Sequence, residues 1–179
     1  MHHPGTVPEE PALTPPDAEA LYAQLRTRVQ ALLDAEPATR LVGIATGGAW
    51  IAERLHADLK QPGACGVVSS VMHRDDFARR GLASSVQTQL PFDVNGAKVL
   101  LIDDVLYTGR TLRAVLNELF DHGRPQSVRL AVLVDRGGRE LPIEPQLCVA
   151  QVEVPPGQSL ELARDDSGRL RFVLEAIQA

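Results

Sequence analysis

The sequence predicts an α/β fold in which a doubly wound parallel sheet is covered by helices on both faces. Short runs of continuously apolar residues alternate with segments whose apolar residues recur at helical spacing. This alternation is typical of strands that are buried on both faces and joined by crossover helices. Only 4% of the residues are aromatic although 44% are hydrophobic, so the core must consist mainly of Leu, Val, Ile and Ala.

Four elements are predicted in the first half of the chain. A helix begins at Asp17, and Pro37 ends it; its leucines and valine recur on one face. Three further elements follow. A buried strand that enters a Gly turn is expected at residues 40–48, a helix at residues 49–59 and another apolar strand at residues 65–72.

The second half begins with a long polar connection, residues 73–97, that lacks convincing periodicity. A strand, a strongly amphipathic helix and a further strand then follow, expected at residues 98–103, 110–122 and 127–135. The last part contains strand-like pieces separated by Pro and Gly, at residues 147–154, 160–164 and 170–175.

Length, charge and cysteine content narrow the class of protein. We expect one domain, residues 17–179, after a Pro-rich segment, residues 1–16, that is disordered or loosely attached. The net charge of -5 does not indicate a protein that mainly grips a polyanion. Cys65 and Cys148 lack the spacing of a disulfide framework or a zinc site. With no signal peptide and no membrane-spanning apolar run, we expect a cytoplasmic location without a membrane partner.

The stretch VLLIDDVLYTGRT, residues 99–111, is the most informative motif. A turn from a strand into a helix presents backbone N–H groups to an anion, and Thr108 and Thr111 add hydroxyl donors. Asp103 and Asp104 would repel a bare phosphate, so the ligand must also carry hydroxyl groups or a divalent cation. A sugar phosphate with Mg²⁺ satisfies both requirements.

Each part of this stretch, taken alone, has other interpretations. An acidic pair at a strand end can cap a helix or be solvated, and receiver-type domains carry such pairs too. The complete run of apolar strand, acidic pair, Thr-Gly-x-Thr and amphipathic helix is more specific. A P-loop nucleotide-binding site is disfavoured because the chain lacks a Gly-Lys-Ser/Thr phosphate loop.

This motif resembles the signature of type I phosphoribosyltransferases, which bind 5-phosphoribosyl 1-diphosphate (PRPP). Residues 123–143, GRPQSVRLAVLVDRGGRELPI, closely resemble a stretch of the PyrR family, pyrimidine-operon attenuators that also show uracil phosphoribosyltransferase activity. Residues 73–81 resemble that family's mobile loop, and residues 41–48 its first phosphate loop. The resemblance extends from about Leu21 to about Pro145.

The resemblance implies a type I phosphoribosyltransferase-like sheet with a small hood from the termini, Mg²⁺ as cofactor, and assembly into a homo-dimer or higher oligomer. Asp103 and Asp104 would be catalytic, accepting hydrogen bonds from ribose hydroxyls directly or through Mg²⁺, and Arg74 would act from the loop that closes over substrate. The resemblance implies three further groups of residues. The diphosphate would lie at Thr46, Gly47 and Gly48, and the base at Val134, Asp135 and Arg136. The 5-phosphate would lie at the segment Val105, Leu106, Tyr107, Thr108, Gly109, Arg110 and Thr111.

The sequence departs from the family pattern at positions that bear on function. Gly47 stands where the family usually has Arg, so diphosphate would lose a bidentate donor. Gly138 and residues 150–152 replace residues of the family's basic, RNA-binding face. We therefore predict an enzyme that makes UMP from uracil and PRPP. The alternatives are an RNA-binding attenuator that senses uridine nucleotides and a catalytically idle sensor of PRPP or nucleotide.

Overall fold

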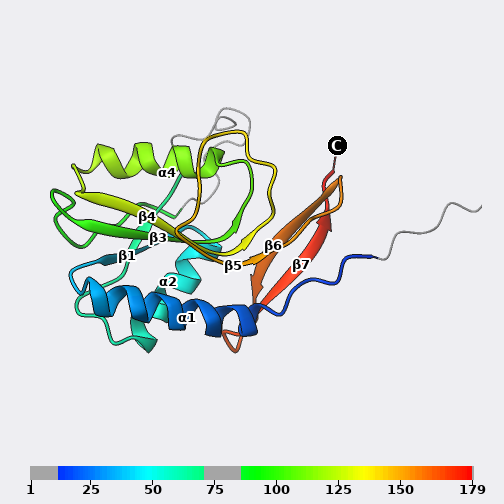
Figure 1. Ribbon diagram of the computed structural model, residues 1–179, viewed down its shortest axis with the longest axis horizontal. Coiled ribbons are helices and arrows are strands. Elements are labelled where there is room, and N and C mark those ends of the chain that lie inside the picture. Colours follow the sequence, from blue (N-terminus) through cyan, green and yellow to red (C-terminus); the bar gives the residue numbers. More distant parts are fainter. Residues whose placement is uncertain (1–11, 71–85, 179) are drawn as a thin grey trace, which may run out of the picture.

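The computed structural model describes residues 12–70 and 86–178, which form a parallel sheet with helices on both faces (Figure 1). The strand order is β2-β1-β3-β4-β5, and all neighbouring pairs are parallel. The strands are β1 (Arg40–Ile44), β2 (Gly66–Val68), β3 (Lys98–Leu106), β4 (Ser127–Asp135) and β5 (Leu147–Gln151). The order reverses between β1 and β3, which confirms the predicted doubly wound sheet and marks the place where ligands bind in such folds.

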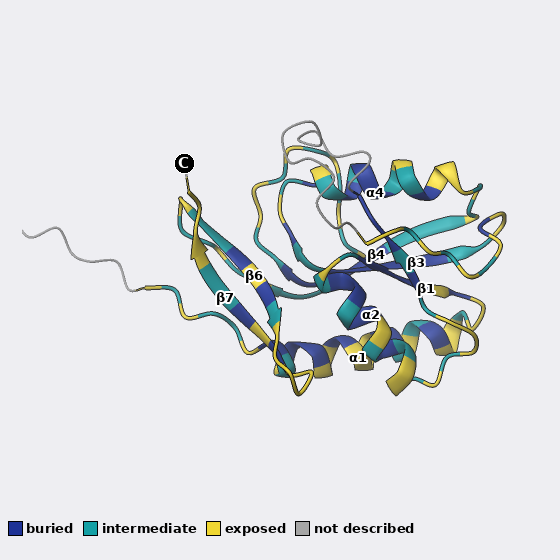
Figure 2. Cartoon of the chain, turned by 180° about the vertical axis from the view of Figure 1, so that it is seen from behind, coloured by how far each residue is buried: buried dark blue, intermediate teal, exposed yellow. Residues whose placement is uncertain are grey.

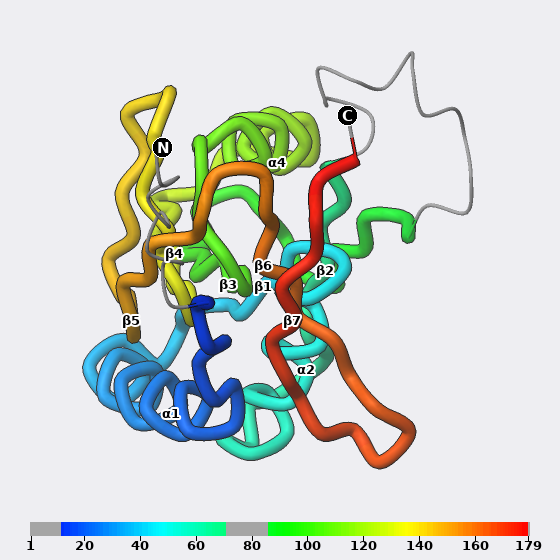
Figure 3. The backbone as a smooth tube through the Cα atoms, turned by 90° about the vertical axis from the view of Figure 1, so that its right-hand side faces the viewer, coloured from blue at the N-terminus to red at the C-terminus, as the bar shows by residue number. Residues whose placement is uncertain are grey.

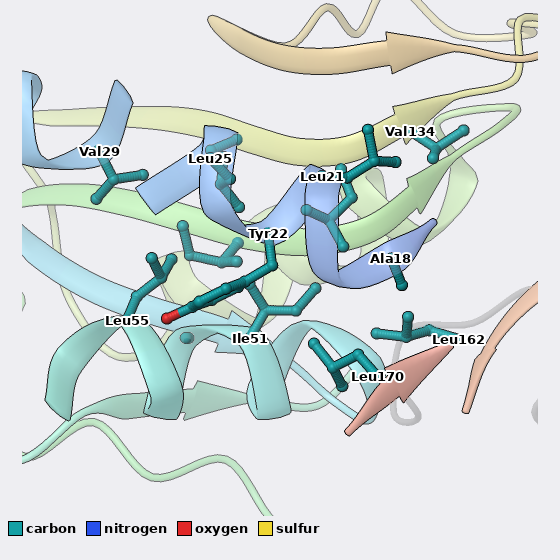
Figure 4. Packing of buried hydrophobic residues seen from close by; sticks show 14 of the residues in the cluster. Ala18, Leu21, Tyr22, Leu25, Val29, Ile51, Leu55, Val134, Leu162 and Leu170 are labelled. Carbon is teal, nitrogen blue, oxygen red and sulfur yellow. The ribbon is translucent and has the colours of Figure 1, made fainter. Parts of the chain in front are cut away.

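Helices cover the two faces of the sheet unequally. Helices α1 (Ala18–Ala35) and α2 (Gly47–Asp58) lie on one face, and α4 (Arg110–Asp121) lies on the other (Figure 1). Alternate residues of β3 enter the two cores: Leu100 and Ile102 pack with α1 and α2, whereas Leu101 packs with α4. Figure 4 shows the first core, where Leu21, Leu25 and Val29 of α1 lie against Ile51 and Leu55 of α2.

The predicted start of the first helix is confirmed by its cap. The Asp17 carboxylate accepts the backbone N–H groups of Glu19 and Ala20 at 3.1 and 3.2 Å, which satisfies donors that the first turn leaves free. Residues 12–16, the described part of the predicted N-terminal segment, contain no helix or strand, and residues 1–11 lie outside the described chain.

A C-terminal hairpin forms a separate two-stranded antiparallel sheet, β6 (Gln158–Arg164) with β7 (Leu170–Ala176). It lies beyond the carboxyl end of the main sheet (Figures 1 and 3). Leu160 and Leu162 of β6 are buried in the core beside α1 and α2. The first turn of α1 anchors the hairpin, since Glu19 Oε1 accepts the backbone N–H of Leu170 at 2.8 Å. Both ends of the described chain therefore build the hood, whose tip is exposed (Figure 2).

Several predicted boundaries are wrong: the helix expected at residues 49–59 is α2, Gly47–Asp58, and the strand expected at residues 147–154 ends at Gln151. The strand expected to end at Asp103 continues to Leu106, because β3 and β4 stay paired through Val105 opposite Val134 and Leu106 opposite Asp135. The acidic pair therefore lies within the strand. The strand expected at residues 65–72 ends at Val68; the next backbone N–H, of Ser69, donates instead to Thr88 Oγ1 at 3.0 Å. In the described part of the chain, no helix combines the length and apolar character needed to cross a membrane.

Candidate functional site

A cavity of about 420 Å³ opens at the carboxyl end of the sheet, between β1 and β3. Its wall comes from four parts of the chain: the end of β1 with the following turn and the first residues of α2, the end of β3 with the turn into α4, the residue after β4, and strand β6. The lining residues are Ile44, Ala45, Thr46, Gly47, Trp50, Asp103, Asp104, Val105, Tyr107, Thr111, Arg136, Ser159, Leu160, Glu161 and Leu162. Eight of these are residues that the sequence marked as candidates.

The acidic pair is held by the backbone of β3 itself. Asp103 is buried, with 6% of its surface exposed, and its Oδ1 accepts the backbone N–H of Asp104 at 2.9 Å. Asp104 Oδ1 accepts the backbone N–H of Val105 at 2.8 Å. These bonds orient both carboxylates at the cavity wall. In the described residues nothing hydrogen-bonds to Asp104 Oδ2, which leaves an acceptor for a ligand.

The turn into α4 requires glycine. Gly109 has a φ of 89°, a left-handed conformation that side chains disfavour. The backbone N–H of Arg110 donates to Thr108 Oγ1 at 3.2 Å. Arg110 itself points away, because its Nε donates to Glu140 Oε2 at 2.7 Å. Thr108 satisfies one N–H group of the first turn, and Gly109, the N-cap residue, has no side chain to satisfy another, so this helix N-terminus favours an anion, as the sequence predicted.

The turn after β1 approaches β3 closely through two glycines. A Cβ on Gly47 would lie 2.3 Å from Asp104 Oδ2, and a Cβ on Gly48 would lie 2.2 Å from the carbonyl oxygen of Ile102. Gly48 is buried against β3 and does not line the cavity, whereas Thr46 and Gly47 do. The absence of side chains here brings the start of α2 directly against the acidic pair.

The residues at the end of β4 and just after it differ in how they meet the cavity. Val134 is completely buried and presents no side chain to it. Asp135 pairs with Arg139, whose hydrogen bonds lower the pKa of this carboxyl. The Arg136 guanidinium lies 3.9 Å from the centre of the Tyr107 ring, and its Nε is buried without a hydrogen-bond acceptor in the described chain. Arg136 is therefore the residue of this group that lines the cavity.

Several sequence-predicted residues are not brought to the cavity wall. Leu106 is buried in the core beside α4, and Thr108, Gly109 and Arg110 lie along the turn without lining the cavity. Arg74 lies outside the described residues, as do Arg79 and Arg80.

Sequence reasoning missed the contribution of the hood and of α2. Ser159, Leu160, Glu161 and Leu162 of β6 line the cavity, as does Trp50 of α2. No local pattern identifies the β6 residues, since their position depends on how the hairpin docks. Trp50 offered a signal, because it is the single tryptophan of the chain and lies two residues after Gly48.

Comparison with known proteins assigns the family. The model of the phosphoribosyl transferase domain matches residues 18–152. A relative called "Bifunctional protein PyrR" from Ralstonia nicotianae is 48% identical over 155 residues, covering 85% of this chain and 88% of that protein. A second protein of that name, from Nitrosococcus oceani, is 42% identical over 164 residues, covering 89% and 92%. The chain belongs to the PyrR family of phosphoribosyltransferases.

Solved structures confirm the fold of this PyrR-family chain. A hypoxanthine phosphoribosyl transferase of Trypanosoma cruzi superposes with a TM-score of 0.61 at 19% identity, covering 93% of this chain and 92% of that one. A hypoxanthine-guanine phosphoribosyltransferase from Bacillus anthracis gives 0.59 at 16% identity, covering 83% and 87%. The matched phosphoribosyl transferase domain ends at residue 152, before β6, so the hood that lines the cavity lies beyond the residues that this domain model matches.

Proposed function

We propose that this chain transfers ribose 5-phosphate from PRPP to uracil, which forms UMP and releases diphosphate. The observation that carries the proposal is the shared cavity: the acidic pair of β3, the turn into α4 and the glycine turn before α2 face one space. A sugar bearing phosphates at both ends needs this combination of hydroxyl acceptors and anion-binding turns. Uracil as the base is taken from the resemblance to pyrimidine-operon attenuators.

Each part of the site has a role in binding PRPP. Asp103 and Asp104 would accept hydrogen bonds from the ribose 2- and 3-hydroxyls. Residues 107–111 would hold the 5-phosphate through backbone N–H groups and the hydroxyls of Thr108 and Thr111, with the helix dipole of α4 adding to the attraction. The turn at residues 46–48 would lie against the diphosphate, where glycines allow close approach of the backbone.

The base would lie beside the end of β4, at residues 134–136. Val134 is buried, so its contribution to the base is through the backbone. Arg136 lines the cavity with a buried, unpaired Nε–H, and a uracil carbonyl oxygen is a suitable acceptor for it. The neighbouring wall is formed by β6, which limits the access of water to the reacting carbon.

The residues fit a Mg²⁺ ion that arrives with PRPP. Mg²⁺ is usually held by one or two carboxylates together with phosphate oxygens and water, and Asp103 and Asp104 supply such carboxylates. Residues 12–70 and 86–178 contain no group of three or more His, Cys, Asp or Glu side chains suited to a metal ion. The ion, when bound, would neutralise charge on the departing diphosphate.

Catalysis then rests on positioning and electrostatics. A uracil ring nitrogen forms a bond to the anomeric carbon while the bond from this carbon to diphosphate breaks, and the proton that the nitrogen loses is taken up by the departing diphosphate or by water. The transition state has oxocarbenium character, and the carboxylates at the ribose would lie where positive charge develops. Holding both reactants in one cavity, in the geometry of the attack, would supply a further part of the rate enhancement. No covalent nucleophile is required.

RNA binding is a second candidate, because the relatives are called bifunctional. The structure offers little to support it around the turn after β4. A surface pocket there is lined by residues 135–138 and 151–153, which include Gly138, Gln151 and Glu153 but no lysine. Arg136 is the one cation among these lining residues, beside the carboxylates of Asp135 and Glu153, so the gain from counterion release is reduced.

The deciding experiment measures diphosphate release from PRPP and Mg²⁺ with uracil, with other nucleobases and without a base. Turnover with uracil alone supports the proposal. No turnover with any base, despite measurable binding of PRPP or UMP, would leave a nucleotide sensor. Salt-sensitive, specific binding of a pyrimidine leader RNA at physiological salt, in the absence of turnover, would place RNA binding first.

A further inference from the structure

Arg139 lies outside the cavity wall, yet its guanidinium connects the turn after β3 with the end of β4. Nη1 donates to the carbonyl oxygen of Tyr107 at 2.7 Å and to Asp135 Oδ1 at 3.0 Å, and Nη2 donates to Asp135 Oδ2 at 2.5 Å. Nε donates to the carbonyl oxygen of Ile143 at 2.7 Å. Four of the five N–H groups of an arginine are thus used inside the protein.

The pairing of Arg139 with Asp135 is largely protected from solvent, whereas the hydrogen bond to the carbonyl oxygen of Tyr107 is exposed. The side chains of Arg139 and Asp135 are 23% and 12% exposed. Their mutual hydrogen bonds raise the pKa of Arg139 and lower the pKa of Asp135, so both groups stay charged at neutral pH. A charged, bidentate and largely buried pair holds its geometry more firmly than an exposed ion pair does.

Tyr107 is also contacted by other residues of the turn that contains Arg139. The Arg136 guanidinium covers one face of its ring at 3.9 Å, and a Cβ on Gly138 would lie 2.5 Å from its Cε2. Next to it, the carbonyl oxygen of Thr108 accepts the backbone N–H of Glu140 at 2.9 Å. Residues 136–141, here called the backing turn, therefore lie behind the turn into α4, and Arg139 joins them to it.

We propose that Arg139 is a positioning residue that fixes Tyr107 and, through it, the 5-phosphate turn at residues 107–111. This inference rests on the proposed function, because it assumes that a 5-phosphate binds there. Arg139 touches no substrate; it keeps the turn ordered before the phosphate arrives. Without it, ligand binding must order the turn, and that ordering weakens binding. Lysine does not replace it, because an ammonium group cannot reach all three acceptor residues in the planar geometry of a guanidinium.

The test compares Arg139→Lys and Arg139→Gln with a matched control, Arg124→Gln. Arg124 is exposed, precedes β4 at the opposite end of the sheet, and its side chain makes no hydrogen bond or ion pair within the described residues. Trp50, the single tryptophan, lines the cavity and reports binding by its fluorescence. Dissociation constants are measured for PRPP, ribose 5-phosphate and diphosphate, each with Mg²⁺.

We expect both Arg139 variants to bind PRPP and ribose 5-phosphate at least about tenfold more weakly, which is about 1.4 kcal/mol. Diphosphate, which would contact the separate turn at residues 46–48, keeps its affinity, and the Arg124 control behaves as the parent. A loss of affinity confined to ligands with a 5-phosphate separates positioning from a general structural effect.

Three results would overturn the inference. One is parental affinity for PRPP in both Arg139 variants, even if their melting temperatures fall. Another is an equal loss for all three ligands. The third is failure of the parent to bind either ligand with a 5-phosphate, which would remove the phosphate site itself. By contrast, a parent that binds PRPP but releases no diphosphate with uracil contradicts the proposed function and leaves the role of Arg139 intact.

Discussion

Neighbouring glycines at the start of α2 allow the site and the fold to be perturbed separately. A Cβ on Gly47 would lie 2.3 Å from Asp104 Oδ2, the end of a side chain that can rotate. A Cβ on Gly48 would lie 2.2 Å from the carbonyl oxygen of Ile102, which belongs to the central strand β3. Gly47→Ala and Gly48→Ala therefore add the same methyl group at adjacent positions with different consequences.

The geometry sets the expected magnitudes. In Gly47→Ala the 2.3 Å separation must open to at least 3.0 Å, so the Asp104 carboxylate moves away from the ribose site. Displacing a positioning group by about 1 Å lowers rates by up to about 100-fold, so we expect kcat/KM to fall by about 10- to 100-fold. The free energy of unfolding should change by less than about 0.5 kcal/mol. In Gly48→Ala the helix must move from the strand, which costs about 1–3 kcal/mol of stability.

Urea denaturation followed by Trp50 fluorescence gives the free energy of unfolding, and diphosphate release gives kcat/KM. Parental kcat/KM in Gly47→Ala would show that the position of Asp104 does not matter for the reaction. Parental stability in Gly48→Ala would show that α2 does not approach β3 as closely as the structure indicates. A loss of stability in Gly47→Ala equal to that in Gly48→Ala would refute the distinction between a mobile and a fixed neighbour.

Two further predictions test the phosphate site and the opposite end of the sheet. Asp104→Asn combined with Thr108→Ala should eliminate PRPP binding while circular dichroism and the unfolding transition stay close to those of the parent; retained PRPP affinity would refute the assignment of this turn. Hydrogen bonds from Arg129 and Lys98 lower the pKa of Glu36 from 4.5 to about 2, so this carboxylate stabilises the fold above pH 4.5 and the contribution is lost as the pH falls through 2. Unfolding measured between pH 2 and 5 should therefore depend less on pH in Glu36→Gln than in the parent, and equal pH dependence would contradict the ion-pair geometry.

Much of the fold could be predicted from the sequence because its local signals agree with its packing. The residues expected for the fourth strand of the sheet, 127–135, coincide with β4, and the helix expected at 110–122 differs from α4 at its last residue alone. In each segment, apolar periodicity and a flanking Gly or charged residue give the same boundary. The predicted strand that contains Asp103 is too short. A carboxylate after an apolar run indicates the end of a strand, but the pairing of β3 with β4 continues past this residue.

The candidate site could be predicted in part for the same reason. Asp103, Asp104 and Thr111 lie in one continuous motif, and the structure places all three at the cavity wall. Ser159 and Glu161 depend on the docking of a hairpin more than 40 residues later, which no local pattern encodes. Arg139 is a similar case. The sequence does not show that it contacts Tyr107, Asp135 and Ile143, because these contacts depend on where the backing turn lies in the folded chain.

The arrangement of the acidic pair explains how adjacent carboxylates are tolerated at the end of a buried strand. Each carboxylate accepts the backbone N–H of the next residue, so β3 itself offsets part of the cost of burying charge. Asp104 is not paired with a cation in the described chain, and Gly47 leaves no room for a side chain beside it. Of three arginines near the site, Arg110 pairs with Glu140 and Arg139 pairs with Asp135, whereas Arg136 lines the cavity and lies over the Tyr107 ring. The negative charge of the pair is therefore left for a ligand that supplies hydroxyl groups or a cation, and in the proposed complex Arg110 and Arg139 hold the turns that would face its phosphate.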